Sequence, residues 1–190
     1  MPDPTRWSVA LAKAPTTGAS AATAKQASLA PGIQASRAMA DADLKRVLKL
    51  ADVFREVGAA VDVPPALIAA LASRESRCGN VLDAQGFGDH GHAFGILQID
   101  KRFHTLLGLD KGPGSREHIE QAAGILAAFR KQVQTKHPDW EDPFVLKGAV
   151  VAYNSGVSNV QTKLGLDQGT TGNDYGSDVI ARAQFYSEKL

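Results

Sequence analysis

The chain has 190 residues, 44% of them hydrophobic and 22% charged, and 21 Lys and Arg against 20 Asp and Glu leave a net charge of +1. This length and composition suit one globular domain, because a single core serves about 100–200 residues. The near-neutral charge offers no basic stripe for a phosphate backbone, so we expect no nucleic-acid partner. No apolar run reaches the roughly 18–20 residues of a membrane span, so we expect no membrane insertion.

The chain has a single cysteine, Cys78, which cannot form an intrachain disulfide. We therefore expect packing alone to hold the fold, with Cys78 as an inert small hydrophobe and not a nucleophile. Near the N-terminus, the apolar stretch 9–12 is shorter than the region of about 7–15 residues that a secretory signal needs. No export signal is legible, and the sequence leaves the location of the protein open.

Residues 1–40 are rich in Ala, Thr, Ser, Gly and Pro and show no sustained apolar period. We predict an irregular segment here, wrapped on the domain. Within it, residues 1–15 are expected to form a frayed arm, and residues 16–190 are expected to form the single domain.

The first two predicted helices follow this segment. From Asp41 to Val57, apolar residues at spacings of three and four predict an amphipathic helix that Gly58 ends. Asp62 is expected to cap the next helix, with two prolines tolerated in its first turn. Its residues 66–76 are apolar on nearly every face, which predicts a central, buried position.

A glycine-rich segment, 79–100, is expected to form a small β region with tight turns. Three further helices are predicted after it. The first begins at Ser115, the second is capped by Asp142 and stops at Gly156, and the last covers Tyr175 to Tyr186. The elements together predict an α+β fold that is mainly α-helical.

Two motifs in the glycine-rich segment suggest ligands that we do not expect. Residues 86–91 match G-x-G-x-x-G, but a dinucleotide fold needs a buried strand before the glycines and a helix directly after them. His90, His92 and Asp89 could bind a metal, yet no further ligands of the usual spacing accompany them. We interpret the histidines as solvated loop residues and expect neither a cofactor nor a metal.

Glu75 is the strongest candidate for catalysis. Three, four, seven and eight residues before it stand apolar side chains of the same helix face: Ala72, Leu71, Ile68 and Leu67. Burial and the negative end of the helix dipole both favour the protonated carboxyl, which could then act as a general acid. The alternative is an ordinary salt bridge with Arg74 or Arg77, which would lower the pKa.

Asp89 and Asp100 follow Glu75 in the glycine-rich segment. Carboxyl groups that converge on one cleft, one protonated and the others ionised, are what cleavage of a glycosidic bond requires. The alternative is that Asp89 caps a turn while Asp100 pairs with Lys101 or Arg102.

Five segments together resemble the goose-type lysozymes, in a likeness that runs from about Thr16 to the C-terminus. They are Ser73-Arg74-Glu75-Ser76, Gly86-Phe87-Gly88-Asp89, Phe94 to Arg102, Ala152-Tyr153-Asn154-Ser155-Gly156 and Asp174-Tyr175. The single cysteine makes the chain most similar to the cysteine-poor fish members. The resemblance implies a lysozyme-like fold with a small antiparallel β-sheet beside the active-site cleft.

The resemblance also implies roles for individual residues. Glu75 matches the proton donor of the family, and Asp89 and Asp100 match the carboxylates that place and activate water, with inversion of the anomeric centre. The residues that match the sugar cleft are Gln98, His104, Ile125, Phe129, Tyr153, Asn154 and Tyr175. Polar groups of these types pair with sugar hydroxyls, and apolar surfaces meet pyranose faces. Core packing is the alternative for Ile125 and Phe129.

We therefore expect a monomeric, bacteriolytic muramidase of antibacterial defence that binds peptidoglycan and N-acetylglucosamine oligomers. The family role suggests secreted or phagolysosomal action. Glu75-Ser76, residues 95–98 and residues 152–156 also look similar to lytic transglycosylases, which share the fold and release an anhydro-sugar without water. Asp89 and Asp100 favour hydrolysis, since the other route needs no water-holding carboxylates. A recognition protein without catalysis is the remaining alternative, and the retention of all three acids argues against it.

Overall fold

The computed structural model describes residues 5–190. Over these residues the chain forms α-helices, short β-strands and four 3-10 turns. The helices are α1 (Arg6–Lys13), α2 (Ala21–Lys25), α3 (Ile33–Lys49), α4 (Ala51–Val61), α5 (Pro65–Ser76), α6 (Arg116–Lys136), α7 (Asp142–Ser155) and α8 (Tyr175–Tyr186). The strands are β1 (Phe87–Gly88), β2 (Ala93–Phe94) and β3 (Ile99–Asp100). The predicted class, mainly α-helical with a small antiparallel sheet, is confirmed.

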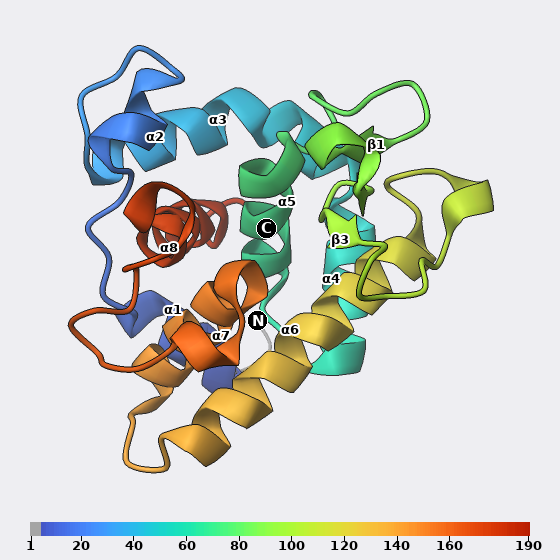
Figure 1. Ribbon diagram of the computed structural model, residues 1–190. Coiled ribbons are helices and arrows are strands. Elements are labelled where there is room, and N and C mark those ends of the chain that lie inside the picture. Colours follow the sequence, from blue (N-terminus) through green and yellow to red (C-terminus); the bar gives the residue numbers. More distant parts are fainter. Residues whose placement is uncertain (1–4) are drawn as a thin grey trace.

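Helix α5 lies at the centre of the molecule, with α3, α4 and α8 packed against it (Figure 1). Its residues 66–73 are all buried, because their side chains are apolar or small on every face. Pro65 begins the helix at a position where a backbone N–H is not needed, and Arg77 ends it in the left-handed conformation. The last turn of this buried helix carries Glu75.

The three strands pair in the order β1-β2-β3, with Phe87 opposite Phe94 and Ala93 opposite Asp100. Each strand has only two residues, since the chain turns between β2 and β3 and places Gln98 at a positive φ of 50°. A 3-10 turn, Asp89–Gly91, follows β1 where a dinucleotide site would have a long helix. The local structure therefore agrees with our rejection of the G-x-G-x-x-G motif.

The prediction of an irregular segment over residues 1–40 is wrong for the described part of it, which contains α1, α2 and the start of α3. Trp7 and Leu11 of α1 are buried in the main core, and the Thr5 hydroxyl caps the helix. Short Ala-rich helices carry little apolar periodicity and depend on tertiary packing, which the sequence pattern does not show. Residues 1–4 lie outside the described residues, and the division at residue 15 stays a prediction.

The single helix predicted from Asp41 is also wrong, because the backbone breaks at Leu50 and separates α3 from α4. Helix α4 continues through Gly58, where a Cβ atom would lie 2.6 Å from the carbonyl oxygen of Val63. Glycine is thus needed there for a close approach and not to end the helix. Asp62 ends α4 in the left-handed conformation and does not cap α5.

The predictions for the C-terminal helices are closer to the structure. Helix α6 begins after Ser115, whose hydroxyl accepts a hydrogen bond from the backbone of His118. Helix α7 ends at Ser155 with Gly156 as its C-cap, close to the prediction, although its N-cap is Glu141 and not Asp142. Helix α8 has the predicted bounds.

Among residues 5–190, no single helix is long and apolar enough to cross a bilayer, while α4 and α5 meet the length and hydropathy criteria only as a pair bent by 119°.

Candidate active site

One cavity, of about 750 Å³, is lined by all three predicted acids, Glu75, Asp89 and Asp100. They come from the last turn of α5, from the 3-10 turn after β1 and from β3. Most of the predicted sugar-binding residues line the same cavity: Gln98, His104, Ile125, Phe129, Tyr153 and Asn154. Elements far apart in the sequence thus meet at one cleft beside the small sheet.

Tyr175 is the exception among the predicted sugar-binding residues. It lines a second cavity, of about 570 Å³, and its side chain is almost completely buried. The two cavities share Glu75, Asn154 and Thr171 in their walls. Glu75 therefore stands where they meet.

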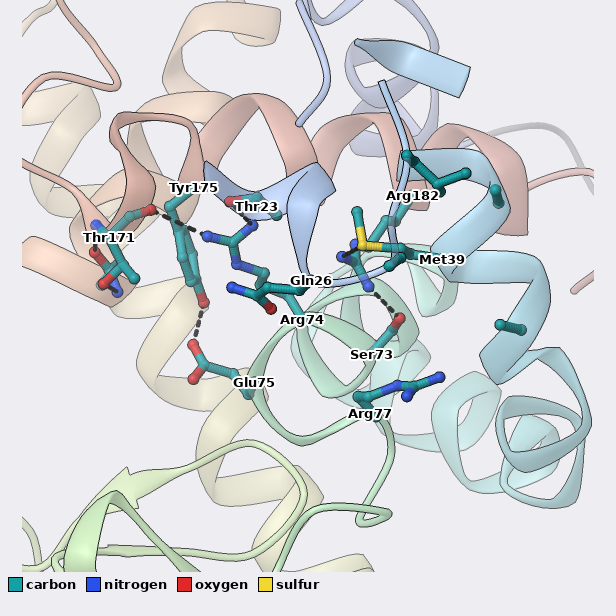
Figure 2. Close-up of a pocket in the computed structure, with 15 residues that line it drawn as sticks. Thr23, Gln26, Met39, Ser73, Arg74, Glu75, Arg77, Thr171, Tyr175 and Arg182 are labelled. Atoms are coloured by element: carbon teal, nitrogen blue, oxygen red, sulfur yellow. Dashed lines mark hydrogen bonds between the residues drawn. The ribbon is translucent and has the colours of Figure 1, made fainter. Parts of the chain in front are cut away.

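Glu75 is half-buried, and its Oε1 accepts a hydrogen bond from the hydroxyl of Tyr175 (Figure 2). Burial raises the pKa of Glu75 to about 7, and this effect outweighs the lowering by the Tyr175 hydrogen bond and by the charge of Arg74. The carboxyl group therefore keeps its proton up to nearly neutral pH, as its place on an apolar helix face predicts. Within the described chain, Glu75 forms no salt bridge with Arg74 or Arg77.

Arg74 instead forms salt bridges with two buried carboxylates, one at the N-cap of α8 and one within that helix. Its Nη1 lies 2.6 Å from Asp178 and its Nη2 lies 3.0 Å from Asp174. Arg182, one turn beyond Asp178, pairs with the same carboxylate at 3.0 Å. The sequence analysis missed this cluster, although charged residues at intervals of four on the apolar helix 175–186 are a signal for buried ion pairs.

Arg102 lies between the two aspartates of the cleft. Its Nε is 3.0 Å from each carboxylate oxygen of Asp100, and its Nη2 is 2.5 Å from Asp100 Oδ2 and 3.5 Å from Asp89 Oδ2. Hydrogen bonds from Arg102 lower the pKa of Asp100 to about 2, so this carboxyl is ionised near neutral pH. Asp100 therefore pairs with Arg102, the alternative considered from the sequence, and also lines the cleft.

The turn between β2 and β3 is held by two helices. The backbone N–H of Leu97 donates to Nε2 of His118, and the carbonyl of Leu97 accepts a hydrogen bond of 2.8 Å from the Tyr153 hydroxyl. Burial lowers the pKa of His118 to about 4, which keeps it a neutral acceptor. Gln98 packs closely over Gly88, where a Cβ atom would lie 2.3 Å from Oε1 of Gln98. These contacts position Gln98 and Tyr153 at the cleft.

Other lining residues combine structural contacts with exposure to the cavity. Asn154 is fixed by Thr171, since its Oδ1 accepts from the Thr171 backbone N–H at 3.0 Å and its Nδ2 donates to the hydroxyl at 3.2 Å. Ile125 and Phe129 are partly buried against the core and also line the cleft, so the two interpretations of these residues are compatible. The sequence analysis missed Phe103, an aromatic side chain that is 77% exposed and lies at the cleft.

The structure also places the residues of the alternative metal and nucleophile sites considered from the sequence. Across residues 5–190, no three His, Cys, Asp or Glu side chains converge as metal ligands would. His90 is exposed, while His92 is partly buried and not fully solvated as predicted. Cys78 is buried, and burial raises the pKa of its thiol to about 12, in agreement with an inert residue.

The sequence is similar to those of known proteins over almost the whole chain. A family model described as "Lysozyme g" matches residues 10–189. The chain is 45% identical to lysozyme g of Casuarius casuarius over 174 residues, which are 91% of this chain and 92% of that protein. It is 44% identical to lysozyme g of Cyprinus carpio over 178 residues, 93% of this chain and 94% of that protein. It is 43% identical to lysozyme g of Takifugu rubripes over 182 residues, 92% of this chain and 94% of that protein. The chain therefore belongs to the lysozyme g family and is a glycoside hydrolase of the lysozyme class.

Proposed function

We propose that the protein is a monomeric muramidase of antibacterial defence, which lyses bacteria by cleaving their peptidoglycan. The bond cleaved is the β-1,4 bond between N-acetylmuramic acid and N-acetylglucosamine. The proposal rests mainly on one observation, that Glu75, whose pKa is raised by burial, lines the same cavity as Asp100, whose pKa is lowered by Arg102. Such a pair is suited to general acid catalysis beside an ionised partner.

In the proposed mechanism Glu75 donates its proton to the glycosidic oxygen as the bond to the anomeric carbon breaks. Water attacks that carbon from the opposite face and inverts it. Asp100 has both carboxylate oxygens engaged by Arg102, so it orients the water and is the weaker proton acceptor. Asp89, which Arg102 reaches only at 3.5 Å, takes the proton of the water. This route requires room for water, with acid and base about 6.5–9.5 Å apart.

The variant Glu75→Gln tests the role of the proton donor. Glutamine has nearly the same shape but cannot supply the proton, so we expect turnover to fall by at least about 10²-fold while oligosaccharide binding persists. A matched control is Glu56→Gln, because Glu56 is an exposed residue of α4 that pairs with Arg116 away from the cleft. Undiminished lysis of bacterial cells by Glu75→Gln would refute the assignment.

The products distinguish the proposed reaction from its alternatives. Inverting hydrolysis gives a new reducing end that is initially the α-anomer, which NMR detects during the reaction. Anhydro ends in the mass spectrum of digested cell wall would identify a lytic transglycosylase instead. Binding of peptidoglycan without any cleavage would identify a recognition protein.

A further inference from the structure

The wall of the second cavity carries a different charge from the wall of the first. The first cavity contains Asp89 and Asp100 and, within the described chain, has no Lys or Arg in its wall. The second is lined by Arg74, Arg77 and Arg182, which Figure 2 shows around the same space. The two joined parts of the cleft therefore differ in the charged side chains of their walls, and Arg102 pairs with both aspartates of the first from outside its wall.

Of these three arginines, Arg77 presents the accessible charge of the second cavity. The side chains of Arg74 and Arg182 are 8% and 5% exposed and pair with Asp174 and Asp178, which are at most 4% exposed. Glu75 is the acidic residue in this wall, and its raised pKa keeps it largely uncharged below neutral pH. The charge that a ligand meets in the second cavity is therefore mainly that of Arg77, whose side chain is 50% exposed.

Arg77 differs from the other two arginines in its hydrogen bonding. Arg74 and Arg182 use both Nη atoms in contacts with neighbouring side chains. Arg77 makes one side-chain bond, from Nε to Asp43 at 3.3 Å, and its side chain is 50% exposed. Over residues 5–190, its Nη1 and Nη2 have no hydrogen-bond partner, so they can bind a ligand.

We propose that the second cavity binds a carboxylate carried by the muramic acid residue of the substrate, with Arg77 as the ligating side chain. This inference rests on the proposed function. N-acetylglucosamine is neutral and has no group that a guanidinium specifically pairs with, whereas the lactyl ether of muramic acid ends in a carboxylate or in a peptide that bears carboxylates. A guanidinium pairs with a carboxylate through two parallel hydrogen bonds.

The rest of the wall suits the same ligand. Leu29 and Met39 add apolar surface beside the arginines, and Gln26 adds an amide. Methyl groups of a lactyl or alanyl unit fit such apolar surface, and an amide fits a peptide bond. By contrast, the first cavity has the aromatic residues Phe103 and Phe129, which suit sugar rings.

The test compares the kinetics of the protein and of Arg77→Gln on three soluble substrates. These are a neutral N-acetylglucosamine oligomer, glycan strands whose peptides have been removed to leave free lactyl carboxylates, and strands that keep their peptides. We expect Arg77→Gln to raise KM about tenfold on the carboxylate-bearing strands, the size of one charge-assisted hydrogen bond, with little change in kcat. KM for the neutral oligomer should change much less.

The pattern identifies the source of the carboxylate. A rise in KM on both kinds of strand indicates the lactyl carboxylate, and a rise on the peptide-bearing strands alone indicates the peptide. The matched control is Arg55→Gln, since Arg55 is 48% exposed, pairs with Asp52 and lines neither cavity. It should change no KM by more than about twofold, as expected for a partly exposed ion pair.

An equal change of KM on all three substrates, or none, would overturn the inference. Turnover of the neutral oligomer measures how much of each variant is folded, so a folding defect is recognised separately. Failure of the unmodified protein to cleave any muramyl glycan would overturn the proposed function instead.

Discussion

The hydroxyl of Tyr175 donates a hydrogen bond to Oε1 of Glu75 and so joins the first residue of α8 to the last turn of α5. The bond favours the ionised carboxylate and lowers the pKa, while burial favours the protonated form and raises it. Burial has the larger effect, and the resulting pKa is about 7. The protonation state of Glu75 therefore depends on two opposing effects, burial and the hydrogen bond from Tyr175.

Removal of this hydroxyl should shift the balance in a known direction. The acid must be protonated to act, so kcat/KM should fall as pH rises through about 7, the pKa of Glu75. In Tyr175→Phe the lowering contact is gone, and we expect the alkaline limb of the profile to move to higher pH. Tyr153→Phe is the matched control, because that hydroxyl donates to Leu97 and not to Glu75. A limb that moves to lower pH in Tyr175→Phe would contradict this account.

Arg102 should control the ionisation of Asp100. In Arg102→Gln we expect the pKa of Asp100, followed by carbon NMR of its carboxyl group, to rise from about 2 toward its ordinary value of about 3.9. We also expect kcat to fall about tenfold, because the two aspartates lose the group that holds them in place. Lys101→Gln, a change at the neighbouring cation, should leave the titration of Asp100 as it is. A titration of Asp100 that is the same in Arg102→Gln would show that another group sets the low pKa.

The contrast between Glu75 and Arg102 shows what the sequence could predict at the site. The apolar face around Glu75 is made by residues three to eight positions away on one helix, so its burial follows from local spacing. The contact of Arg102 with Asp89 depends on how β1 and β3 are arranged in the sheet, and their order cannot be read from two-residue strands. Likewise, the place of Tyr175 in the second cavity depends on the packing of α8 against α5.

The buried carboxylate of Asp178 should be essential for stability. It accepts hydrogen bonds from Ser36, Arg74 and Arg182 and is fully buried. In Asp178→Asn the buried guanidinium groups of Arg74 and Arg182 lose a negatively charged partner. We expect the free energy of unfolding in urea to fall by about 3–5 kcal/mol. Asp52→Asn is the control, because the Asp52 side chain is 90% exposed and pairs with Arg55. Equal stability of the two variants would mean that the buried pairs contribute no more than a surface pair.

Gly95 and Gly91 allow a test of close packing at constant backbone strain. Both have positive φ, 77° and 84°, but a Cβ atom at Gly95 would lie 2.3 Å from Nε2 of His118, whereas one at Gly91 meets nothing within 4 Å. Gly91→Ala should cost about 1 kcal/mol of stability for the left-handed conformation alone. Gly95→Ala should cost at least about 2 kcal/mol more, since it displaces His118 from a packed site. Urea denaturation of the pair measures the difference, and equal losses would show that His118 moves freely.

The helical fold could be predicted best where long amphipathic or buried helices carry a cap, as at Ser115 for α6. It could not be predicted over residues 6–25, because α1 and α2 are 8 and 5 residues long and bury few large side chains. Helices of this length gain most of their stability from contacts with distant elements. Trp7 is the clearest signal that was available there, as a large aromatic residue that is normally buried.

The burial of Cys78 has a practical consequence for handling the protein. The core that contains this thiol includes residues of α1 and of α3 to α8 and is complete without a covalent cross-link in the described chain. Reducing agents should therefore leave the melting temperature of the fold unchanged. Recombinant protein should reach its native state equally well with or without an oxidant.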